Sequence, residues 1–187
     1  MNRAHHEILA SDEWAEHLRT DLLPWVLSVA DLGDDVIEVG PGPGRTTDLL
    51  REHAGHLTAV ELDADLAASL TARMAGTNVT VLHADATATG LPEGRFSAAA
   101  CFSMLHHVPT PELQDRTFAE LCRVLRPGGL LVAVDSLDGP ALREFHADDV
   151  FVPLDPTTLA DRLTNAGFGE VAMELDELQV RFHARKP

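Results

Sequence analysis

The stretch VIEVGPGPGRTT, residues 36–47, decides the fold of this 187-residue chain. A short run rich in β-branched residues, typical of a buried strand, leads directly into three glycines that alternate with two prolines. Because glycine has no Cβ atom, such a turn adopts left-handed conformations and lets another molecule approach the backbone. The stretch therefore predicts a strand at 35–39, a tight turn at 40–44 and a helix that begins at Arg45.

Strands and helices alternate on both sides of this turn. Runs of β-branched and apolar residues predict further strands at 57–62, 78–85, 96–105 and 130–136, and helical patterns predict helices at 45–55, 63–76 and 110–129. Upstream, residues 11–31 predict a helix that is kinked or divided at Pro24. This order is typical of βαβ units, in which right-handed crossovers place helices on both faces of a parallel sheet.

The C-terminal part of the chain has a different pattern. A helix predicted at 156–168 precedes two strand-like runs, 169–175 and 178–185, which only Asp176 and Glu177 separate. Two strands joined so closely form a hairpin, so one of them must be antiparallel.

We therefore expect a single α/β domain with a Rossmann-like, doubly wound and mostly parallel sheet. Its parts would be an N-terminal helical segment (1–33), a ligand-binding core (34–135) and a substrate-side segment that carries the terminal hairpin (136–187).

The charge of the chain argues against two classes of partner. Thirty acidic residues against 14 basic ones give a formal net charge of −16. An acidic surface repels phosphate backbones and anionic lipid, so duplex nucleic acid and membranes are not expected as partners. A solubilising surface charge explains the composition, and a local basic patch stays open.

Cysteines and the N-terminus indicate a cytoplasmic protein. Cys101 and Cys122 each lie in an apolar run without metal-ligand spacing, which is typical of buried thiols in a reducing compartment. The first residues contain no apolar signal core, and no run approaches the length of a membrane span. The sequence leaves the oligomeric state open, with a homodimer among the options.

Two acids close neighbouring strands at the same edge of the predicted sheet as the glycine turn. Glu61 ends the second strand, 21 residues after Gly40, where an acid can bind the hydroxyls of an adenosine ribose. Asp85 ends the third strand, where a carboxylate can accept a hydrogen bond from an adenine amino group. Taken alone, Glu61 would be a solvated strand end and Asp85 an Asx turn.

The spacing of the glycines selects among nucleotide classes. The dinucleotide pattern is G-x-G-x-x-G, whereas this chain has G-x-G-x-G, with Arg45 at the position of the last glycine. Pro41 and Pro43 remove amide donors that a pyrophosphate would use. Glu38 would repel a phosphate and attract an ammonium group. These features favour an adenosine with a cationic, amino-acid-like arm over NAD.

Five motifs occur in the order of a known family. They are EVGPGPG (38–44), AVELD (59–63), ADAT (84–87), SMLHHVP (103–109) and RVLRPGG (123–129). Together they resemble the class I S-adenosylmethionine-dependent methyltransferases of the small-molecule, single-domain kind, over residues 30–135. The resemblance implies S-adenosylmethionine as cofactor and a seven-stranded sheet with one antiparallel strand from the terminal hairpin.

The resemblance also implies cofactor contacts for the matching positions. The turn would be made by glycines, the methionine ammonium would lie near an acid directly or through water, the ribose would bind a second acid, and the adenine would bind the segment after the third strand. The methionine arm would lie along backbone carbonyls of 101–104, and Thr46 or Thr47 could add a hydroxyl near the methionine carboxylate. The residues are Gly40, Gly42 and Gly44 for the turn; Glu38 for the ammonium; Glu61 for the ribose; Leu62 for packing on adenine; Asp85 and Ala86 for the adenine edge; and Phe102 and Ser103 for the methionine arm.

Histidines are the candidates for a general base. His106 and His107 follow the fourth strand, where the family often has a histidine, and a neutral imidazole there can accept a proton, with His107 as the better candidate. The alternative is that one histidine is packed or capping and the other faces solvent. His146 is a weaker candidate. No metal is expected, because the histidines lack metal-ligand spacing. The Asn-Pro-Pro-Tyr signature of amino-group methylation on nucleobases is also absent at 103–106.

The sequence therefore predicts a methyltransferase that acts on a small-molecule acceptor, with O-, N- and C-methylation all open. The acceptor would enter between the helices around Trp14 and Trp25 and segment 136–155, which is either a lid or a surface helix. Two alternatives remain: a non-catalytic module that binds S-adenosylmethionine, and an NAD-dependent oxidoreductase.

Overall fold

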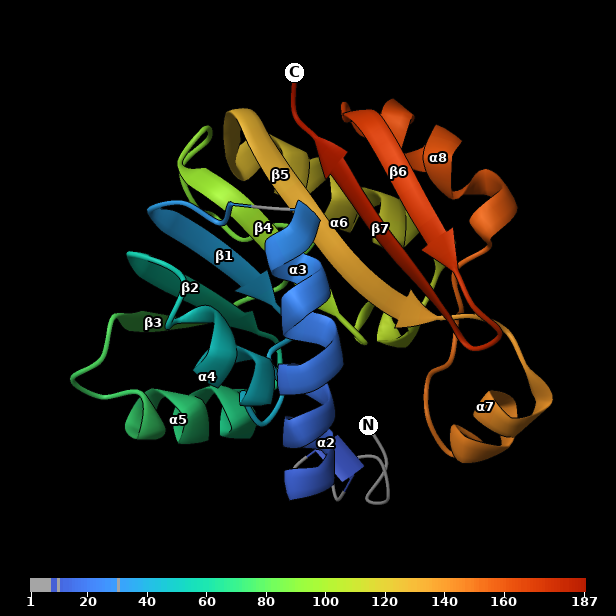
Figure 1. Cartoon of the computed structure of the whole chain (residues 1–187), viewed down its shortest axis with the longest axis horizontal. Helices are drawn as coiled ribbons and strands as arrows, with labels where there is room; N and C mark the ends of the chain where they lie inside the picture. Colours follow the sequence, from blue (N-terminus) through green and yellow to red (C-terminus); the bar gives the residue numbers. More distant parts are fainter. Residues whose placement is uncertain (1–7, 10, 30) are drawn as a thin grey trace.

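One seven-stranded sheet forms the centre of the computed structural model, which describes residues 8, 9, 11–29 and 31–187. The strands lie in the order β3-β2-β1-β4-β5-β7-β6 (Figure 1). Strands β1 to β5 pair in parallel, and β7 runs antiparallel to both β5 and β6, as the hairpin predicts. The strands are β1 (Asp35–Val39), β2 (His56–Glu61), β3 (Val79–His83), β4 (Phe96–Phe102), β5 (Leu125–Ser136), β6 (Gly169–Leu175) and β7 (Gln179–Arg185).

Helices cover both faces of this sheet, which confirms the Rossmann-like α/β class. The N-terminal helices, α4 and α5 lie on one face, and α6 and α8 lie on the other (Figure 1). The helices are α2 (Asp12–His17), the π-helix η1 (Leu18–Leu22), α3 (Leu23–Val29), α4 (Arg45–Leu50), α5 (Ala64–Arg73), the 3-10 helix η2 (Leu105–His107), α6 (Pro111–Val124), α7 (Pro140–Phe145) and α8 (Pro156–Asn165). No helix within the described residues is long and apolar enough to cross a membrane.

Strand alternation divides the core into two layers. Successive side chains of a strand point to opposite faces, so Val36 belongs to the buried cluster that includes Leu22 of η1, and Ile37 belongs to the cluster on the α6 side that includes Phe118. Both β1 side chains are fully buried. The sheet is thereby packed on both faces, and its strand ends carry the loops.

Two element boundaries differ from the sequence expectation. The N-terminal helical region does not break at Pro24, which is the second residue of α3. The preceding turn is instead a π-helix, in which Leu23 N–H donates to Leu18 C=O. Such a turn widens the helix just before the proline, whose missing N–H would otherwise interrupt the regular pattern.

The second difference lies at the end of α6. The sequence predicts that Pro127-Gly128-Gly129 stops the helix in 110–129, but α6 already ends at Val124 and these three residues belong to β5. Leu125 already pairs with Phe96, and the register shifts by the time Leu130 pairs with Ala98. The Pro-Gly-Gly sequence therefore forms an irregular part of a strand, because pairing with β4 overrides its tendency to form a turn.

Candidate active site

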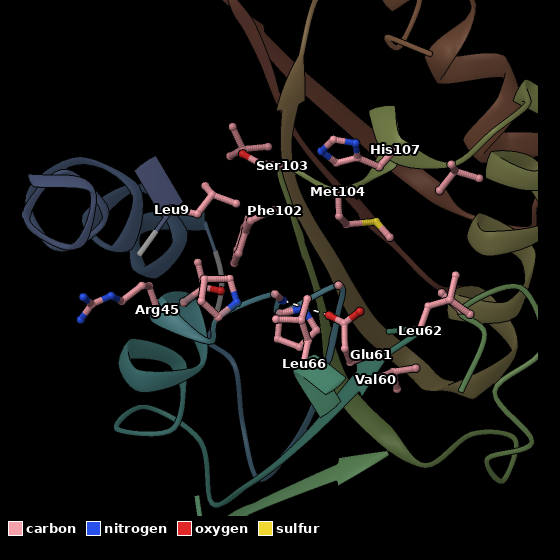
Figure 2. Close-up of a pocket in the computed structure, with 18 of the residues that line it drawn as sticks. Leu9, Arg45, Val60, Glu61, Leu62, Leu66, Phe102, Ser103, Met104 and His107 are labelled. Atoms are coloured by element: carbon pink, nitrogen blue, oxygen red, sulfur yellow. Dashed lines mark hydrogen bonds between the residues drawn. The ribbon is translucent and has the colours of Figure 1, made fainter. Parts of the chain in front are cut away.

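A cavity of about 610 Å³ opens at the carboxyl ends of the central strands. The strand order reverses between β1 and β4, and ligands of open α/β sheets bind at such a reversal. The glycine turn, the end of β2 and the loops after β3 and β4 form its walls, and the N-terminal helices close one side (Figure 2).

The glycine turn shapes the floor of this cavity. Gly40 N–H donates to Val60 C=O at 2.9 Å, and its φ of +67° together with a Cβ position only 2.7 Å from Met104 Cβ leaves no room for a side chain. Gly42 also has a positive φ, +53°, but a Cβ there would meet no atom within 4 Å. The backbone at Gly42 is therefore open to a ligand, as the sequence predicts for this turn.

Glu61 holds the turn in place from the end of β2. Its side chain is buried, with 7% of the residue exposed, and its two oxygens accept from Gly42 N–H at 3.0 Å and Asp63 N–H at 2.9 Å. Asp63 in turn caps α5 by accepting from the amides of Asp65 and Leu66. Glu61 lines the cavity (Figure 2). The carboxylate thus joins the two segments that a nucleoside would contact.

Glu38 lies beneath the turn rather than in the cavity wall. Its carboxylate is fully buried and accepts hydrogen bonds from the hydroxyls of Thr46 and Thr47, the latter at 2.6 Å. Burial raises the pKa of Glu38 to about 7, although the two hydroxyls lower it. Glu38 is not among the described residues that line the cavity, whereas Thr46 is. A pKa of about 7 leaves Glu38 only partly ionised at neutral pH, whereas the expected attraction for an ammonium group requires the charged form.

The loops after β2 and β3 bring the expected adenine-binding residues to the cavity. Leu62, Asp85 and Ala86 all line it. Leu62 is 67% exposed, so its apolar surface is available for packing. Asp85 Oδ1 accepts from Thr87 N–H at 2.8 Å. The Asx turn expected as the alternative role of Asp85 is therefore present. It orients the carboxylate through Oδ1 and leaves Oδ2 for a ligand donor.

The loop after β4 forms the opposite wall. Phe102, Ser103 and Met104 line the cavity (Figure 2), and Ser103 has a φ of +51°, a strained conformation for a residue with a side chain. Asp135 of β5 holds this loop, since its Oδ2 accepts from the amides of Met104 at 3.1 Å and Leu105 at 2.7 Å. Sequence reasoning missed Asp135, although a single acid in the apolar run LLVAVDS was a usable signal.

The two candidate histidines have different environments. His106 is 1% exposed, and its Nδ1 lies 2.6 Å from Asp135 Oδ1. It is not among the described cavity residues, so the packed alternative describes it better than contact with a substrate. His107 lines the cavity and its Nδ1 donates to Val150 C=O at 3.1 Å. Burial, followed by the neighbouring His106, lowers the pKa of His107 to about 4, so its imidazole is neutral at pH 7.

A third histidine joins this pair from a distant part of the sequence. The ring of His146 lies 5.0 Å from that of His106 and 5.4 Å from that of His107, centroid to centroid. It follows α7 and is 3% exposed. The sequence assigned His146 little weight, because it lies in the segment after the fifth strand, far along the chain from His106 and His107.

The structure thus gathers most of the predicted site but not all of it. Gly44 lies outside the lining and packs toward Leu70 and Arg73. The expected acceptor wall also differs: Trp14 lines the cavity, but no described residue of 136–155 does, nor does Trp25, and β7 contributes instead. The predicted site residues that line the cavity are Gly40, Gly42, Glu61, Leu62, Asp85, Ala86, Phe102, Ser103 and His107; those that do not are Glu38, Gly44 and His106.

Curated relatives share the central part of the chain. An uncharacterized methyltransferase of Mycobacterium tuberculosis is 32% identical over 108 residues, which cover 58% of this chain and 53% of the relative. Ribosomal RNA small subunit methyltransferase A of Dehalococcoides mccartyi is 38% identical over 87 residues, 45% of this chain and 30% of the relative. The aligned part thus spans from a fifth to about half of the length of such relatives.

Solved structures share the fold at low sequence identity. The PH0226 protein from Pyrococcus horikoshii superposes with a TM-score of 0.79 at 16% identity, and all of both chains is covered. Phosphoethanolamine N-methyltransferase 2 from Haemonchus contortus, solved with phosphomonomethylethanolamine and S-adenosylhomocysteine, has a TM-score of 0.76 at 14% identity, covering 90% of this chain and 53% of that one. These likenesses bear on the fold alone.

A family match completes the assignment. Residues 36–129, half of the chain, match the family described as "Methyltransferase domain", and they contain the glycine turn, Glu61, Asp85 and the loop after β4. The chain therefore belongs to the class I S-adenosylmethionine-dependent methyltransferase family.

Proposed function

We propose that this chain is an enzyme that transfers the methyl group of S-adenosylmethionine to a small-molecule acceptor. The observation that carries the proposal is the cavity of about 610 Å³, which joins the glycine turn, Glu61 and Asp85 to an apolar wall in one continuous space. Such a volume is typical of small-ligand sites.

Residues at the turn side of the cavity would bind the cofactor. The backbone at Gly42 admits it, Glu61 accepts from the ribose hydroxyls, and Leu62 packs on the adenine. Asp85 accepts from the adenine amino group through its second oxygen, and Ala86 N–H donates to a ring nitrogen. Support comes from the placement of all five residues along one cavity and from the family to which the chain belongs.

The methionine arm would lie between the two loops. Carbonyls of Phe102 and Ser103 would face its ammonium group, and Thr46, which lines the cavity and donates to Glu38, would connect the arm to that buried acid. When bound, the sulfonium supplies an activated methyl group. The walls then contribute by holding an acceptor in line with that methyl group, because proximity and alignment lower the barrier substantially.

His107 is the candidate that receives a proton from the acceptor. It lines the cavity and is neutral at pH 7, so its ring can accept a proton, but a pKa of about 4 makes it a weak base. Asp149 Oδ2, 3.8 Å from His107 Nδ1, stabilises the protonated form. His106 acts on the acceptor only through its neighbour, as a positioning residue held by Asp135.

A small acceptor fits the walls better than RNA does. Trp14, Leu18 and Leu22 provide apolar surface on the N-terminal side of the cavity. The net charge of −16 opposes binding of a phosphate backbone. Because the matches include ribosomal RNA methyltransferases, RNA is the alternative acceptor that any assay must include.

Cofactor binding tests the first half of the proposal. Calorimetric titration with S-adenosylmethionine should give a saturable isotherm, and Glu61→Ala should weaken binding by roughly 1.5–3 kcal/mol, because hydrogen bonds to a charged group are lost. Since Glu61 also anchors Gly42 and Asp63, Glu61→Gln tests binding with the turn partly retained, and thermal unfolding reports the structural cost. Glu52→Gln, at an exposed carboxylate, is the control. Unchanged affinity in Glu61→Ala, or binding of NADH in place of S-adenosylmethionine, would contradict the assignment.

Methyl transfer tests the second half. The protein is incubated with cofactor labelled in the methyl group and a panel of phenols, quinones, amines, carboxylates and small-subunit ribosomal RNA. Label in a small molecule, with none in RNA, supports the proposal. Label in RNA alone identifies the other acceptor class. A protein that binds the cofactor and methylates nothing in the panel would favour a non-catalytic binding module.

A further inference from the structure

Three buried imidazoles converge beside the cavity. His106 and His107 belong to η2, and His146 follows α7, 39 positions later in the chain. One ring nitrogen from each lies within 4.8 Å of the other two. His106 and His146 are 1% and 3% exposed, and the His107 side chain is 17% exposed. Three histidines buried this closely call for a physical explanation, because imidazole is a polar group.

The Nδ1 nitrogen of each ring faces an oxygen. His106 Nδ1 lies 2.6 Å from Asp135 Oδ1, His107 Nδ1 lies 3.1 Å from Val150 C=O, and His146 Nδ1 lies 2.7 Å from Leu142 C=O. A carbonyl can only accept, and Asp135 is already the acceptor for backbone amides, so each Nδ1 carries the proton. In a neutral ring the lone pair then lies on Nε2.

This arrangement is the one that metal-binding histidines use. Such a histidine typically donates its other ring N–H to a carboxylate or a backbone carbonyl, which fixes the tautomer and the ring orientation. Here one ring is fixed by a carboxylate and two by carbonyls.

Two buried carboxylates provide the matching charge. Asp135 is 1% exposed and contacts His106; the Asp149 side chain is 8% exposed, with Oδ2 3.8 Å from His107 Nδ1. Two acids next to three imidazoles favour a divalent cation over an anion, because buried charges are stabilised by opposite charge.

We propose that His106, His107 and His146 form a binding site for a divalent first-row transition metal ion, of which zinc fits best. Imidazole suits zinc, copper, iron and nickel, and three histidines with one open position is an arrangement found in catalytic zinc sites. Zinc–nitrogen bonds of about 2.0–2.1 Å place tetrahedral ligands about 3.3 Å apart, so the nitrogens need to approach one another by up to roughly 1.5 Å. This proposal departs from the expectation that the protein has no metal site.

The site would join two parts of the molecule. His146 lies in the segment that follows β5, and His106 and His107 lie in the loop that forms the cavity wall. The two parts already meet through Val152 N–H, which donates to His106 C=O at 2.7 Å. Since His107 also lines the cavity, an ion bound to its Nε2 would occupy the lone pair that otherwise accepts a proton, so His107 would act as a base only in the metal-free protein. The ion would lie at the cavity wall and leave its open position for water or an acceptor oxygen.

Aromatic packing is the competing explanation. Phe151 stacks on His146 with ring centroids 4.4 Å apart and an interplanar angle of 16°, and Phe145 meets the same ring edge to face at 5.1 Å. Such contacts would bury the rings without any ion. The direction of all three Nδ1 atoms toward acceptors favours the metal site, and an experiment separates the two.

The test is stoichiometric metal binding by the full chain without S-adenosylmethionine, so that its outcome is independent of the proposed methyl transfer. Chelator-treated protein is titrated with Zn²⁺ in competition with a chromophoric chelator, and with Co²⁺ while its visible d–d absorption is followed. We expect one equivalent of each ion, an intense Co²⁺ spectrum typical of four- or five-coordination, and a rise in Tm on adding Zn²⁺.

Variants assign the ligands. His146→Ala and His107→Ala should each weaken Zn²⁺ binding by more than the roughly 10–100-fold that loss of an outer partner costs. His53→Ala removes an exposed histidine outside the cluster and should bind as the wild type does. Circular dichroism and a cooperative unfolding transition establish that each variant is folded.

Two results would overturn the proposal: wild-type protein that binds no stoichiometric Zn²⁺, or folded His146→Ala and His107→Ala that bind it as tightly as wild type. If either variant fails to fold, ¹⁵N NMR of the wild-type histidines decides. Zn²⁺ should then shift the Nε2 signals of three rings, and unshifted signals would leave an aromatic packing cluster only.

Discussion

Glu38 illustrates how a single residue can link stability to pH in this molecule. Its carboxylate is fully buried beneath the glycine turn between Thr46 and Thr47, and burial raises its pKa from 4.5 to about 7. An acid that is easier to ionise in the unfolded chain stabilises the folded state only while it is protonated. The stabilisation is therefore complete below pH 4.5 and is lost as the pH rises through about 7.

The Glu38→Gln variant should remove this dependence. A rise in pKa from 4.5 to about 7 corresponds to roughly 3 kcal/mol. Between pH 4.5 and pH 8 the free energy of unfolding of wild type should therefore fall by about 3 kcal/mol more than that of Glu38→Gln. Urea unfolding at a series of pH values measures the difference, and Glu52→Gln, at an exposed carboxylate, should follow wild type. Parallel curves for wild type and Glu38→Gln would show that Glu38 ionises normally in the folded protein.

Among the elements, the glycine turn after β1 has two separate tasks. At Gly40 the missing side chain makes room for Met104, whereas at Gly42 it leaves open space on the cavity side. Both residues have positive φ, which costs about 1–2 kcal/mol for a residue with a Cβ atom. The turn thus combines a packing requirement with a binding requirement at two neighbouring positions.

Paired alanine substitutions should separate strain from binding. Gly42 and Gly76 have φ of +53° and +79°, and a Cβ at either position meets nothing within 4 Å. Gly42→Ala and Gly76→Ala should therefore each lose about 1–2 kcal/mol of stability. Only Gly42→Ala should also lose affinity for S-adenosylmethionine, because Gly76 does not line the cavity. Thermal unfolding measures the stability of the two variants, and calorimetry measures their affinity. If Gly42→Ala bound S-adenosylmethionine as tightly as Gly76→Ala does, the cofactor would not lie against this turn.

At the scale of the whole molecule, the C-terminal hairpin completes the sheet that carries the site. β7 lies between β5 and β6, and its Phe182 is fully buried, with its ring 6.3 Å from that of Phe118 of α6 in an edge-to-face contact. The same strand supplies Arg181 to the cavity. The last residues of the chain are thus part of the core on which the site is built.

Truncating Phe182 should therefore destabilise the whole fold. Phe182→Ala removes a fully buried aromatic ring and should cost about 3–5 kcal/mol in the free energy of unfolding. Leu178→Ala, in the same hairpin but 62% exposed, should change it by less than about 0.5 kcal/mol. Denaturant unfolding followed by tryptophan fluorescence measures both. A small effect of Phe182→Ala would mean that the hairpin folds independently of the sheet.

The order of elements follows from local patterns, while their ends depend on partners. The runs around Val36 and Phe96 read as strands because their residues are apolar and β-branched or aromatic, and the two-residue gap at Asp176 specifies a hairpin. In contrast, Pro127-Gly128-Gly129 reads as a helix stop and turn, yet pairing of Leu125 with Phe96 draws it into a strand. Local propensity is worth only about 1 kcal/mol per residue, so a tertiary contact can override it.

By itself, the sequence determined the fold class, the position of the turn and the residues at the strand ends. These features depend on backbone conformation and on the period of apolar residues, both of which are written locally in the chain. Only the tertiary structure decided that Glu38 is buried, that Asp135 holds the loop after β4 and that His146 joins His106 and His107. Each of these depends on the approach of residues that are distant in sequence, and the burial that shifts a pKa or gathers three imidazoles arises only when the layers pack.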